Sequence, residues 1–436
     1  MLKPYLGELL LVPYPLELSL IEPCDYGCRY CFAILGDRAR RDYKGGKQEA
    51  NGLRDTMQFL STAHKRRSLE AHLFNQRYPV LMSNRTDPFG RKNRAATISL
   101  LELFQEMEVP VAFQTKGFIQ HEQDFERVMA MVKPSHWYIS ISFLHDSDRA
   151  RVEPGAPPIE YRWELAAELI RRGHVVSIGW NPFVPEWVQL DGDPYKGAEL
   201  HIQRMVDAGV KACAIQPLHL HSSNKSRMTE RELQDLSNGD QEFLNSFAGK
   251  KSIPAHWDAL YRHVSLRLYQ EGISSILFDS GWEQPTWDAT HALYPKTFPT
   301  IADFRNHCAR TKRVGDPVTF EEWWQWLKAW PLPDITAGLG HAIRIQSWTL
   351  CDKITKQEGW AKWKTNMDYE TLFRIAWQWQ DRLGGLTPIG CNAFCYLLDN
   401  GNIVADDNAL PVLAYAPAPD HPLDYYGSWQ IRSYQS

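Results

Sequence analysis

Short apolar runs alternate with longer amphipathic segments from residue 16 to about residue 280 of this 436-residue chain. The apolar runs predict strands over residues 16–21, 79–83, 110–115, 137–142, 174–180, 211–217 and 273–279. The amphipathic segments predict helices over residues 96–107, 121–132, 158–172, 195–208 and 228–247. This alternation favours an α/β fold, a partial (β/α)6-type barrel over residues 1–280 with a parallel sheet and helices outside. In such folds the chemistry gathers at the carboxyl ends of the strands.

The rest of the chain has a different composition. A stretch with several prolines, residues 281–300, predicts a linker or wrapping segment. Residues 301–436 predict a mostly helical, tryptophan-rich domain, which we expect to cover part of the barrel's mouth. The run Thr319-Phe320-Glu321-Glu322 has the form of a capping box that opens one helix, and residues 368–383 predict another. An Asn-Gly pair predicts a hairpin near residues 396–404.

Composition and charge narrow the class of protein. Hydrophobic residues make up 44% of the chain, and no apolar run approaches the ~20 residues of a membrane span. No charged leader precedes the first predicted strand, so we expect a cytoplasmic protein, where thiols stay reduced. The net charge of −4 argues against a generic nucleic-acid binder, yet residues 1–100 carry 16 Lys and Arg against 10 Asp and Glu. Such a basic region suits a phosphate-bearing substrate, unless it is an ordinary solvated surface.

Three cysteines follow the first predicted strand within one short loop. They are Cys24, Cys28 and Cys31, with the spacing C-x3-C-x2-C. Three thiolates at this spacing can hold three irons of a [4Fe-4S] cluster and leave the fourth iron open for a small-molecule ligand. A structural zinc site is the alternative, although zinc needs four ligands, usually as two separated pairs. Disulfides fit poorly, because three close cysteines leave one unpaired.

The spacing, with aromatic Tyr30 just before the last cysteine, resembles the signature of the radical S-adenosylmethionine (SAM) superfamily. The resemblance implies that the open iron chelates SAM and that the backbone around Tyr30 lies on the adenine. It also implies that a reducing protein, such as flavodoxin or ferredoxin, supplies an electron that cleaves the sulfonium bond. The 5′-deoxyadenosyl radical released by this cleavage then abstracts hydrogen from the substrate. The three cysteines are therefore the expected metal ligands and catalytic residues.

Residues after the later strands resemble the spore photoproduct lyase branch of this superfamily. The motifs, within residues 16–220, are Thr86-Asp87, Thr115-Lys116 and an apolar-Ser strand ending at Ser142 that leads into Arg151-Val152-Glu153-Pro154. A SAM site needs an acceptor for the ammonium, a cation for the carboxylate and hydrogen-bonding groups for the ribose. The resemblance implies that Thr86 and Asp87 contact the amino group, Lys116 the carboxylate, and Ser142 the ribose or carboxylate.

One position departs from the lyase pattern. The lyase has a cysteine two residues before its Ser-Asp pair, and that thiol returns hydrogen to the product radical. This chain has Asn84 there, and an amide does not readily donate a hydrogen atom. The substrate radical must then be quenched by 5′-deoxyadenosine, by oxidation through another redox centre, or by another residue. Cys213 on the sixth predicted strand is a candidate donor, although a small buried apolar side chain is its commoner role.

The four other cysteines lie in the C-terminal region: Cys308, Cys351, Cys391 and Cys395. Four thiols are enough for a second [4Fe-4S] cluster or a zinc site. The last two precede the predicted hairpin, a layout that loosely resembles the auxiliary-cluster domains of other radical SAM enzymes. Buried, inert cysteines are the alternative.

The lyase resemblance and the basic N-terminal region favour a radical SAM enzyme of lyase or isomerase type. The expected substrate is a thymine-type or modified nucleotide base in DNA, with repair-like cleavage or isomerisation of a base substituent. A base inside a duplex would have to be extruded. One alternative is oxidation or rearrangement of a peptide or small metabolite with a C-terminal auxiliary cluster. Another is a zinc-bearing DNA-binding protein without catalysis.

Overall fold

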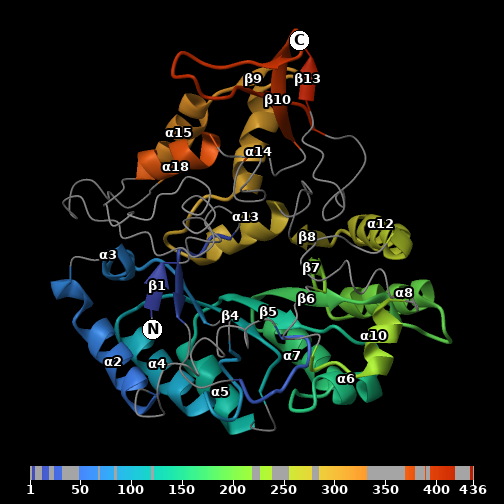
Figure 1. The fold of residues 1–436 in the computed structure, drawn as a ribbon. Coiled ribbons are helices and arrows are strands. Elements are labelled where there is room, and N and C mark those ends of the chain that lie inside the picture. Colours follow the sequence, from blue (N-terminus) through green and yellow to red (C-terminus); the bar gives the residue numbers. More distant parts are fainter. Residues whose placement is uncertain are drawn as a thin grey trace.

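Two β-sheets organise the chain in the computed structural model (Figure 1). One sheet has eight strands and belongs to the N-terminal part, and the other has five strands and belongs to the C-terminal part. The structure describes residues 2–4, 12–18, 24–31, 49–66, 69–82, 86–118, 122–218, 226–237, 255–276, 284–330, 369–378, 388, 393–417 and 433–435.

The N-terminal sheet follows the order of the sequence, from β1 to β8. β1 (Leu2–Pro4) pairs antiparallel with β2 (Leu16–Leu18), and every later neighbour pairs in parallel. The later strands are β3 (Val80–Met82), β4 (Val111–Thr115), β5 (His136–Ser140), β6 (Val175–Phe183), β7 (Ala212–Pro217) and β8 (Ser274–Ile276). All seven predicted strands are therefore present, with ends shifted by a few residues, and the sheet is that of a partial (β/α) barrel.

Helices join successive strands of this sheet. They are α2 (Glu49–Ser61), α3 (Leu69–Asn75), α4 (Arg94–Glu106), α5 (Glu122–Met131), α6 (Asp146–Val152), α7 (Ile159–Arg171), α8 (Pro194–Asp207), α10 (Glu230–Ser237) and α12 (Ala255–Gln270), with short 3-10 turns η2 (Ala63–Lys65) and η3 (Pro185–Trp187). The start of α8 shows why a helix forms there: Pro194 occupies the first turn and the Asp193 carboxylate accepts from Tyr195 N at 2.8 Å. No helix in the described ranges is long and apolar enough to cross a bilayer.

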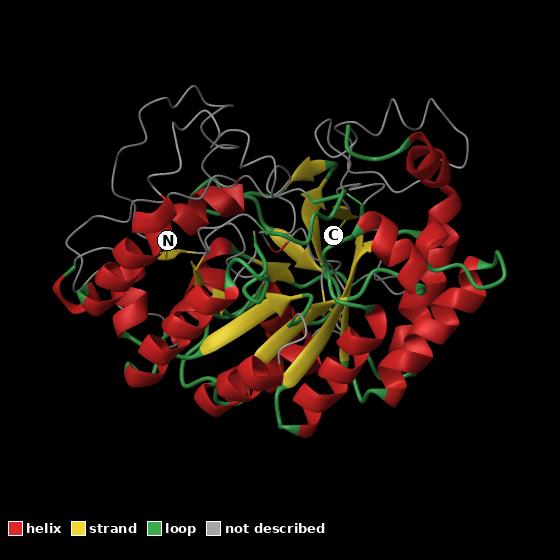
Figure 2. Ribbon diagram, turned by 90° about the horizontal axis from the view of Figure 1, so that it is seen from below, coloured by secondary structure: helices red, strands yellow, loops and turns green. Residues whose placement is uncertain are grey.

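The two faces of the N-terminal sheet carry different side chains. Because side chains alternate along a strand, Phe113, Trp137 and Ile178 point into the main core. The helices lie along that side of the sheet (Figure 2). Ala112 and Ala214 point the other way and belong to separate small clusters on the inner face. These small residues leave room for two residues of the C-terminal part, because Ala302 packs in the cluster of Ala214 and Tyr294 packs in the cluster of Ala112.

The C-terminal part combines helices with the second sheet. Its helices are α13 (Gln284–Leu293), α14 (Ile301–Thr311), α15 (Phe320–Ala329) and α18 (Tyr369–Gln378), and its strands are β9 (Pro317–Val318), β10 (Phe394–Asp399), β11 (Asn402–Ile403), β12 (Leu413–Tyr415) and β13 (Ser433–Gln435). The Thr319 hydroxyl caps α15 by accepting from Glu322 N at 3.2 Å. Asn400 and Gly401, with φ of 49° and 81°, form the predicted hairpin turn between β10 and β11. Trp323 and Trp377 are fully buried in the core.

The stretch predicted as a linker carries helix α13 and attaches to the amino ends of the barrel strands. Tyr294 Oη donates to Val111 O and accepts from His136 N, each at 2.9 Å, where β4 and β5 begin. Phe298 N donates to Pro13 O at 3.1 Å, just before β2. Within the described ranges, this attachment therefore lies opposite the carboxyl edge. The sequence predicted a linker or wrapping segment here, and these contacts show where it attaches. Coverage of the mouth by residues 301–436 stays a prediction.

Substituting Tyr294→Phe should destabilise the fold, because two buried main-chain groups, one N–H and one C=O, would lose their partner. We expect a loss of about 1–3 kcal/mol in the free energy of unfolding, measured by urea denaturation. Tyr195→Phe is the matched control, because Tyr195 is 41% exposed on α8. Equal unfolding midpoints for the two variants would contradict this role of Tyr294.

Candidate active site

The cysteine loop, residues 24–31, is held against the carboxyl edge of the parallel sheet. Tyr26 Oη donates to Gly117 O at 2.7 Å, just beyond the end of β4. Arg29 N donates to Val152 O at 3.0 Å, and Gly155 N donates to Tyr26 O at 2.9 Å. The loop is therefore fastened to the chain that follows β4 and to the turn that follows α6.

Glycine at position 155 allows this close approach. A Cβ atom on Gly155 would lie 2.5 Å from Asp25 O and 2.9 Å from Tyr26 Cα. Gly27 in the loop has φ of +66°, a left-handed conformation that favours glycine. The two chains can therefore pack backbone to backbone.

The three thiols lie in a desolvated setting. Cys28 is buried and Cys24 and Cys31 are partly buried, and all three pack in one small cluster with Tyr26 and Ala156. Burial, followed by the nearby Asp87 carboxylate, raises the pKa of Cys24 to about 12. Burial and then Glu153 raise the pKa of Cys28. Without a bound metal the loop therefore keeps these two groups as neutral thiols, and a metal that bound them would have to displace their protons.

The donor set fits an iron–sulfur cluster in its chemistry. The six cysteines that the structure describes are thiols and form no disulfide. In the described residues no three His, Cys, Asp or Glu side chains are grouped so as to hold a single metal ion. One carboxylate oxygen of Asp25, within the loop itself, is buried without a hydrogen-bond partner. Three soft sulfur ligands in one water-poor loop are what a cluster requires.

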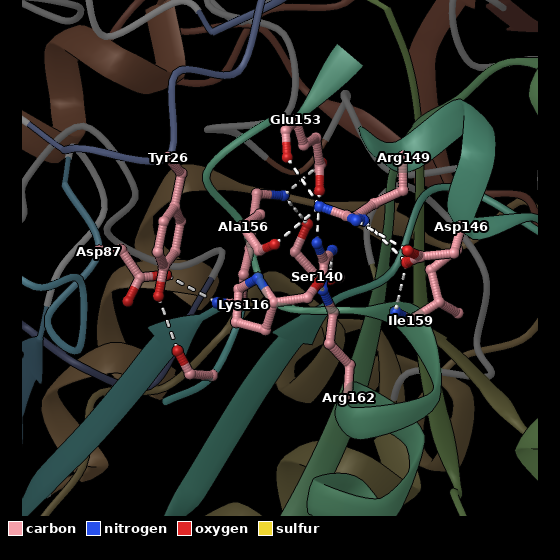
Figure 3. Close-up of polar contacts among 12 residues, drawn as sticks. Tyr26, Asp87, Lys116, Ser140, Asp146, Arg149, Glu153, Ala156, Ile159 and Arg162 are labelled. Atoms are coloured by element: carbon pink, nitrogen blue, oxygen red, sulfur yellow. Dashed lines mark hydrogen bonds and ion pairs between the residues drawn. The ribbon is translucent and has the colours of Figure 1, made fainter. Parts of the chain in front are cut away.

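A buried carboxylate, Glu153, lies beside the loop and pairs with two basic side chains, Lys116 and Arg162 (Figure 3). Its Oε1 is 2.8 Å from Lys116 Nζ and accepts from the Tyr30 hydroxyl, and its Oε2 is 2.6 Å from Arg162. Lys116 Nζ also donates to Tyr30 Oη at 3.0 Å and to Ser140 Oγ at 2.8 Å. This cluster joins the ends of β4 and β5, helix α7 and the cysteine loop.

Electrostatics keep Glu153 ionised. Burial by itself would raise its pKa, but the Arg162 and Lys116 charges and the hydrogen bonds from Lys116 and Tyr30 outweigh burial and lower it to about 2. Arg149 supports the same turn by donating to Glu153 O at 3.2 Å and Ala156 O at 2.8 Å. Glu153 is therefore a fixed negative charge at neutral pH.

Asp87 bridges the chain after β3 to the end of β4. Its carboxylate accepts from Thr115 Oγ1 and Phe89 N, each at 2.9 Å, and from Lys116 N at 2.7 Å. Burial raises the pKa of Asp87 to about 6, although these hydrogen bonds oppose the shift. The structure thus brings Asp87, Lys116 and Tyr30 to one edge, as expected, but each already has partners within the chain.

The serine that meets this cluster is Ser140, two residues before the predicted Ser142. Ser140 contacts Lys116, whereas Ser142 is fully buried and its hydroxyl has no partner among the described residues. Thr86 is partly buried in the chain between β3 and α4. Ser140 ends β5 and Ser142 follows it by two residues, so the alternation of side chains alone could not choose between them.

Sequence reasoning assigned no role to Glu153, Arg162, Ser140 or Tyr26. Glu153 was visible in the Arg-x-Glu-Pro motif, and Tyr26 lies between the first two cysteines. Arg162 has no local signal beyond being a charge on the otherwise apolar face of a helix, where it is 0% exposed. Such a residue indicates a buried partner, but it does not identify the partner.

The structure describes two of the four C-terminal cysteines, Cys308 and Cys395. Cys308 is buried on α14, which packs on the face of β10 that bears Phe394. Cys395, the next residue of β10, points to the opposite face and belongs to a separate apolar cluster. The structure does not bring these two thiols together. Cys351 and Cys391 lie outside the described residues, so a second metal site stays a prediction.

The structure tests one residue considered for hydrogen return, Cys213. Cys213 on β7 pairs with Ile178 and points into the core on the helix-covered side of the sheet. The suggestion that it faces the reaction centre is therefore wrong, because residue parity directs it away. Asn84 lies outside the described residues.

A scan against family models found no match, and a search of curated proteins found none. Among solved structures, the chain is similar to Streptococcus suis SuiB bound to S-adenosylmethionine, with 14% identity over 55% of this chain and 49% of SuiB and a TM-score of 0.34. SuiB bound to the precursor peptide SuiA gives 14% identity over 62% of this chain and 49% of SuiB, with a TM-score of 0.37. A mutant spore photoproduct lyase with bound AdoMet and dinucleoside spore photoproduct gives 12% identity over 54% of this chain and 74% of the lyase, with a TM-score of 0.34. The chain matches about half the length of SuiB.

Substituting Glu153→Gln should cost about 3–5 kcal/mol of unfolding free energy at pH 7, because buried Arg162 would keep an uncompensated charge. The folded pKa of Glu153 is about 2, below its usual 4.5. Its contribution is therefore present above about pH 4.5 and is lost as the pH falls towards 2. Urea denaturation at several pH values should show the gap between wild type and variant narrowing below pH 4.5.

Glu168→Gln is the control. Glu168 also has its pKa lowered to about 2, by Arg171 and Arg172, but it lies near the surface, so its loss should be small at every pH. A gap for Glu153→Gln that does not change with pH would contradict the assigned charge.

Proposed function

We propose that this chain is a radical SAM enzyme in which Cys24, Cys28 and Cys31 hold a [4Fe-4S] cluster. The observation that carries the proposal is the position of the loop: all three thiols lie in one loop fastened to the carboxyl edge of a parallel sheet. Parallel barrels carry out their chemistry at that edge. Held by these three cysteines, such a cluster would supply the one-electron reduction that cleaves the sulfonium bond of SAM into methionine and a hydrogen-abstracting 5′-deoxyadenosyl group.

The chain's own residues shape the loop and keep it dry. Tyr26 fastens the loop to the end of β4, and Gly155 lets the next turn pack directly on it. Cys24 and Cys28, with raised pKa values, release protons when they bind iron. Loading of the cluster should therefore become easier as the pH rises.

SAM would be held by Asp87, Thr86, Lys116 and Ser142. Among the described residues, Oδ2 of Asp87 accepts one hydrogen bond, from Lys116 N, and its other lone pair suits the ammonium of SAM. The three donors of the Lys116 ammonium already contact Glu153, Tyr30 and Ser140. To meet the SAM carboxylate, Lys116 would exchange one of these acceptors. The unpartnered Ser142 hydroxyl suits a ribose or carboxylate oxygen.

For the substrate we propose a thymine-type or modified nucleotide base in DNA, processed by a lyase or isomerase reaction. The Thr-Asp, Thr-Lys and Arg-x-Glu-Pro motifs favour this class. Arg91 and Lys92 are exposed just after the Asp87 turn, where a phosphate could reach them. A reducing protein such as flavodoxin or ferredoxin would supply the electron.

Cys28→Ala should abolish 5′-deoxyadenosine formation, because two thiolates do not hold the cluster. The measurement is 5′-deoxyadenosine release from SAM by anaerobic, dithionite-reduced protein. Cys213→Ala is the control. It removes a buried thiol of the helix-covered core, and this variant should still release 5′-deoxyadenosine. Product formation by the Cys28→Ala protein would sink the cluster assignment.

Iron content separates one cluster from two. We expect about four irons per chain if the N-terminal loop holds the only cluster, and about eight if the C-terminal cysteines hold another. If the N-terminal loop holds the only cluster, the variant lacking Cys24, Cys28 and Cys31 should contain no iron. If that variant keeps about four irons, the C-terminal cysteines hold a second cluster. Zinc in place of iron in the wild-type protein would support the DNA-binding alternative.

A further inference from the structure

Arg227, nearly two hundred residues after the cysteine loop in sequence, bonds directly to the backbone of two of its cysteines. One guanidinium nitrogen donates to Cys28 O at 3.0 Å and the other terminal nitrogen donates to Cys31 O at 2.6 Å. Cys28 O also accepts from Cys31 N at 3.2 Å. The planar fork of the guanidinium thus spans the turn between the second and third thiol.

The position of Arg227 is fixed by the start of α10. Glu232 is fully buried; its carboxylate accepts from Thr229 N at 2.7 Å, and Glu232 N donates to Thr229 Oγ1 at 3.2 Å. The same carboxylate pairs with Arg29 of the cysteine loop at 3.1 Å and lies 3.7 Å from Arg151. Two side chains of one short segment therefore grip the loop, one at its backbone and one at Arg29.

We propose that Arg227 is a positioning residue for the cluster, which fixes the turn between Cys28 and Cys31 and raises the cluster's reduction potential. This inference rests on the function proposed above. A cluster held by three thiolates gains negative charge when it is reduced. A permanent positive charge on the carbonyls of two ligands therefore stabilises the reduced form. Contacts with the turn after α6 hold the other side of the loop.

The geometry also explains why arginine rather than lysine suits this position. A guanidinium offers two parallel donors in a rigid plane, whereas an ammonium is a point charge on a flexible stem. Lysine would keep the charge but lose the bidentate grip. The two contributions of Arg227, charge and grip, can therefore be separated by substitution.

The first test measures the grip without any cluster. Hydrogen–deuterium exchange of peptides spanning residues 24–31 is compared in metal-free wild type, Arg227→Gln and Arg227→Lys. We expect exchange to be roughly tenfold or more faster in Arg227→Gln, because two charged hydrogen bonds are lost. Arg204→Gln is the control, since Arg204 pairs with Glu160 on the outer helices. Exchange equal to that of wild type would overturn the positioning role.

The second test measures the charge in the iron-loaded proteins. The midpoint potential, followed by electron paramagnetic resonance during titration with dithionite, should be lower in Arg227→Gln than in wild type. In Arg227→Lys it should stay close to the wild-type value, and in Arg204→Gln it should not change. An unchanged potential in Arg227→Gln would overturn the electrostatic role. If wild type itself binds no iron, the proposed function fails, whereas the exchange experiment still decides whether Arg227 holds the loop.

Discussion

The candidate site depends on the ion pairs and the hydrogen bond that the buried Glu153 carboxylate makes. It joins Lys116 from the end of β4, Arg162 from α7 and the Tyr30 hydroxyl of the cysteine loop. A buried charge without partners would be costly, so these groups have to come together when the chain folds. Because Lys116 also contacts Ser140, the same cluster fixes two neighbouring strand ends. The carboxyl edges of β4 and β5 are thus tied to the cysteine loop through the Glu153 carboxylate.

Around this charge, the chain encloses the cysteine loop from two sides. The turn after α6 packs backbone to backbone on Tyr26 through Gly155, and Arg227, further along the chain, donates to the carbonyls of Cys28 and Cys31. Both contacts use main-chain atoms of the loop. Neither of these contacts therefore uses a sulfur atom of the three cysteines.

The two faces of the N-terminal sheet carry side chains of different size and polarity. Large apolar residues such as Trp137 fill the space under the helices, while the inner face carries small and polar residues. Gly179 is an example, because a Cβ atom there would lie 2.2 Å from the ring of Tyr138. That ring lies across the inner face. Burial raises the pKa of the Tyr138 hydroxyl, and a hydrogen bond with Asn181 opposes this shift. Tyr294 and Phe298 attach the chain after α13 to the amino ends of the strands, which lie opposite the carboxyl edge.

The sequence by itself determined the period of the strands and helices, the cysteine loop after β2 and the polar residues that follow β3 and β4. Those are local properties, because alternation and turn chemistry act over a few residues. Only the tertiary structure decided that Glu153 meets Arg162, that Ser140 rather than Ser142 reaches Lys116, and that Cys213 points away. Such pairings depend on register and on side-chain reach between segments far apart in the chain. A local pattern records the polarity of each residue, but it does not record which distant residue completes its hydrogen bonds.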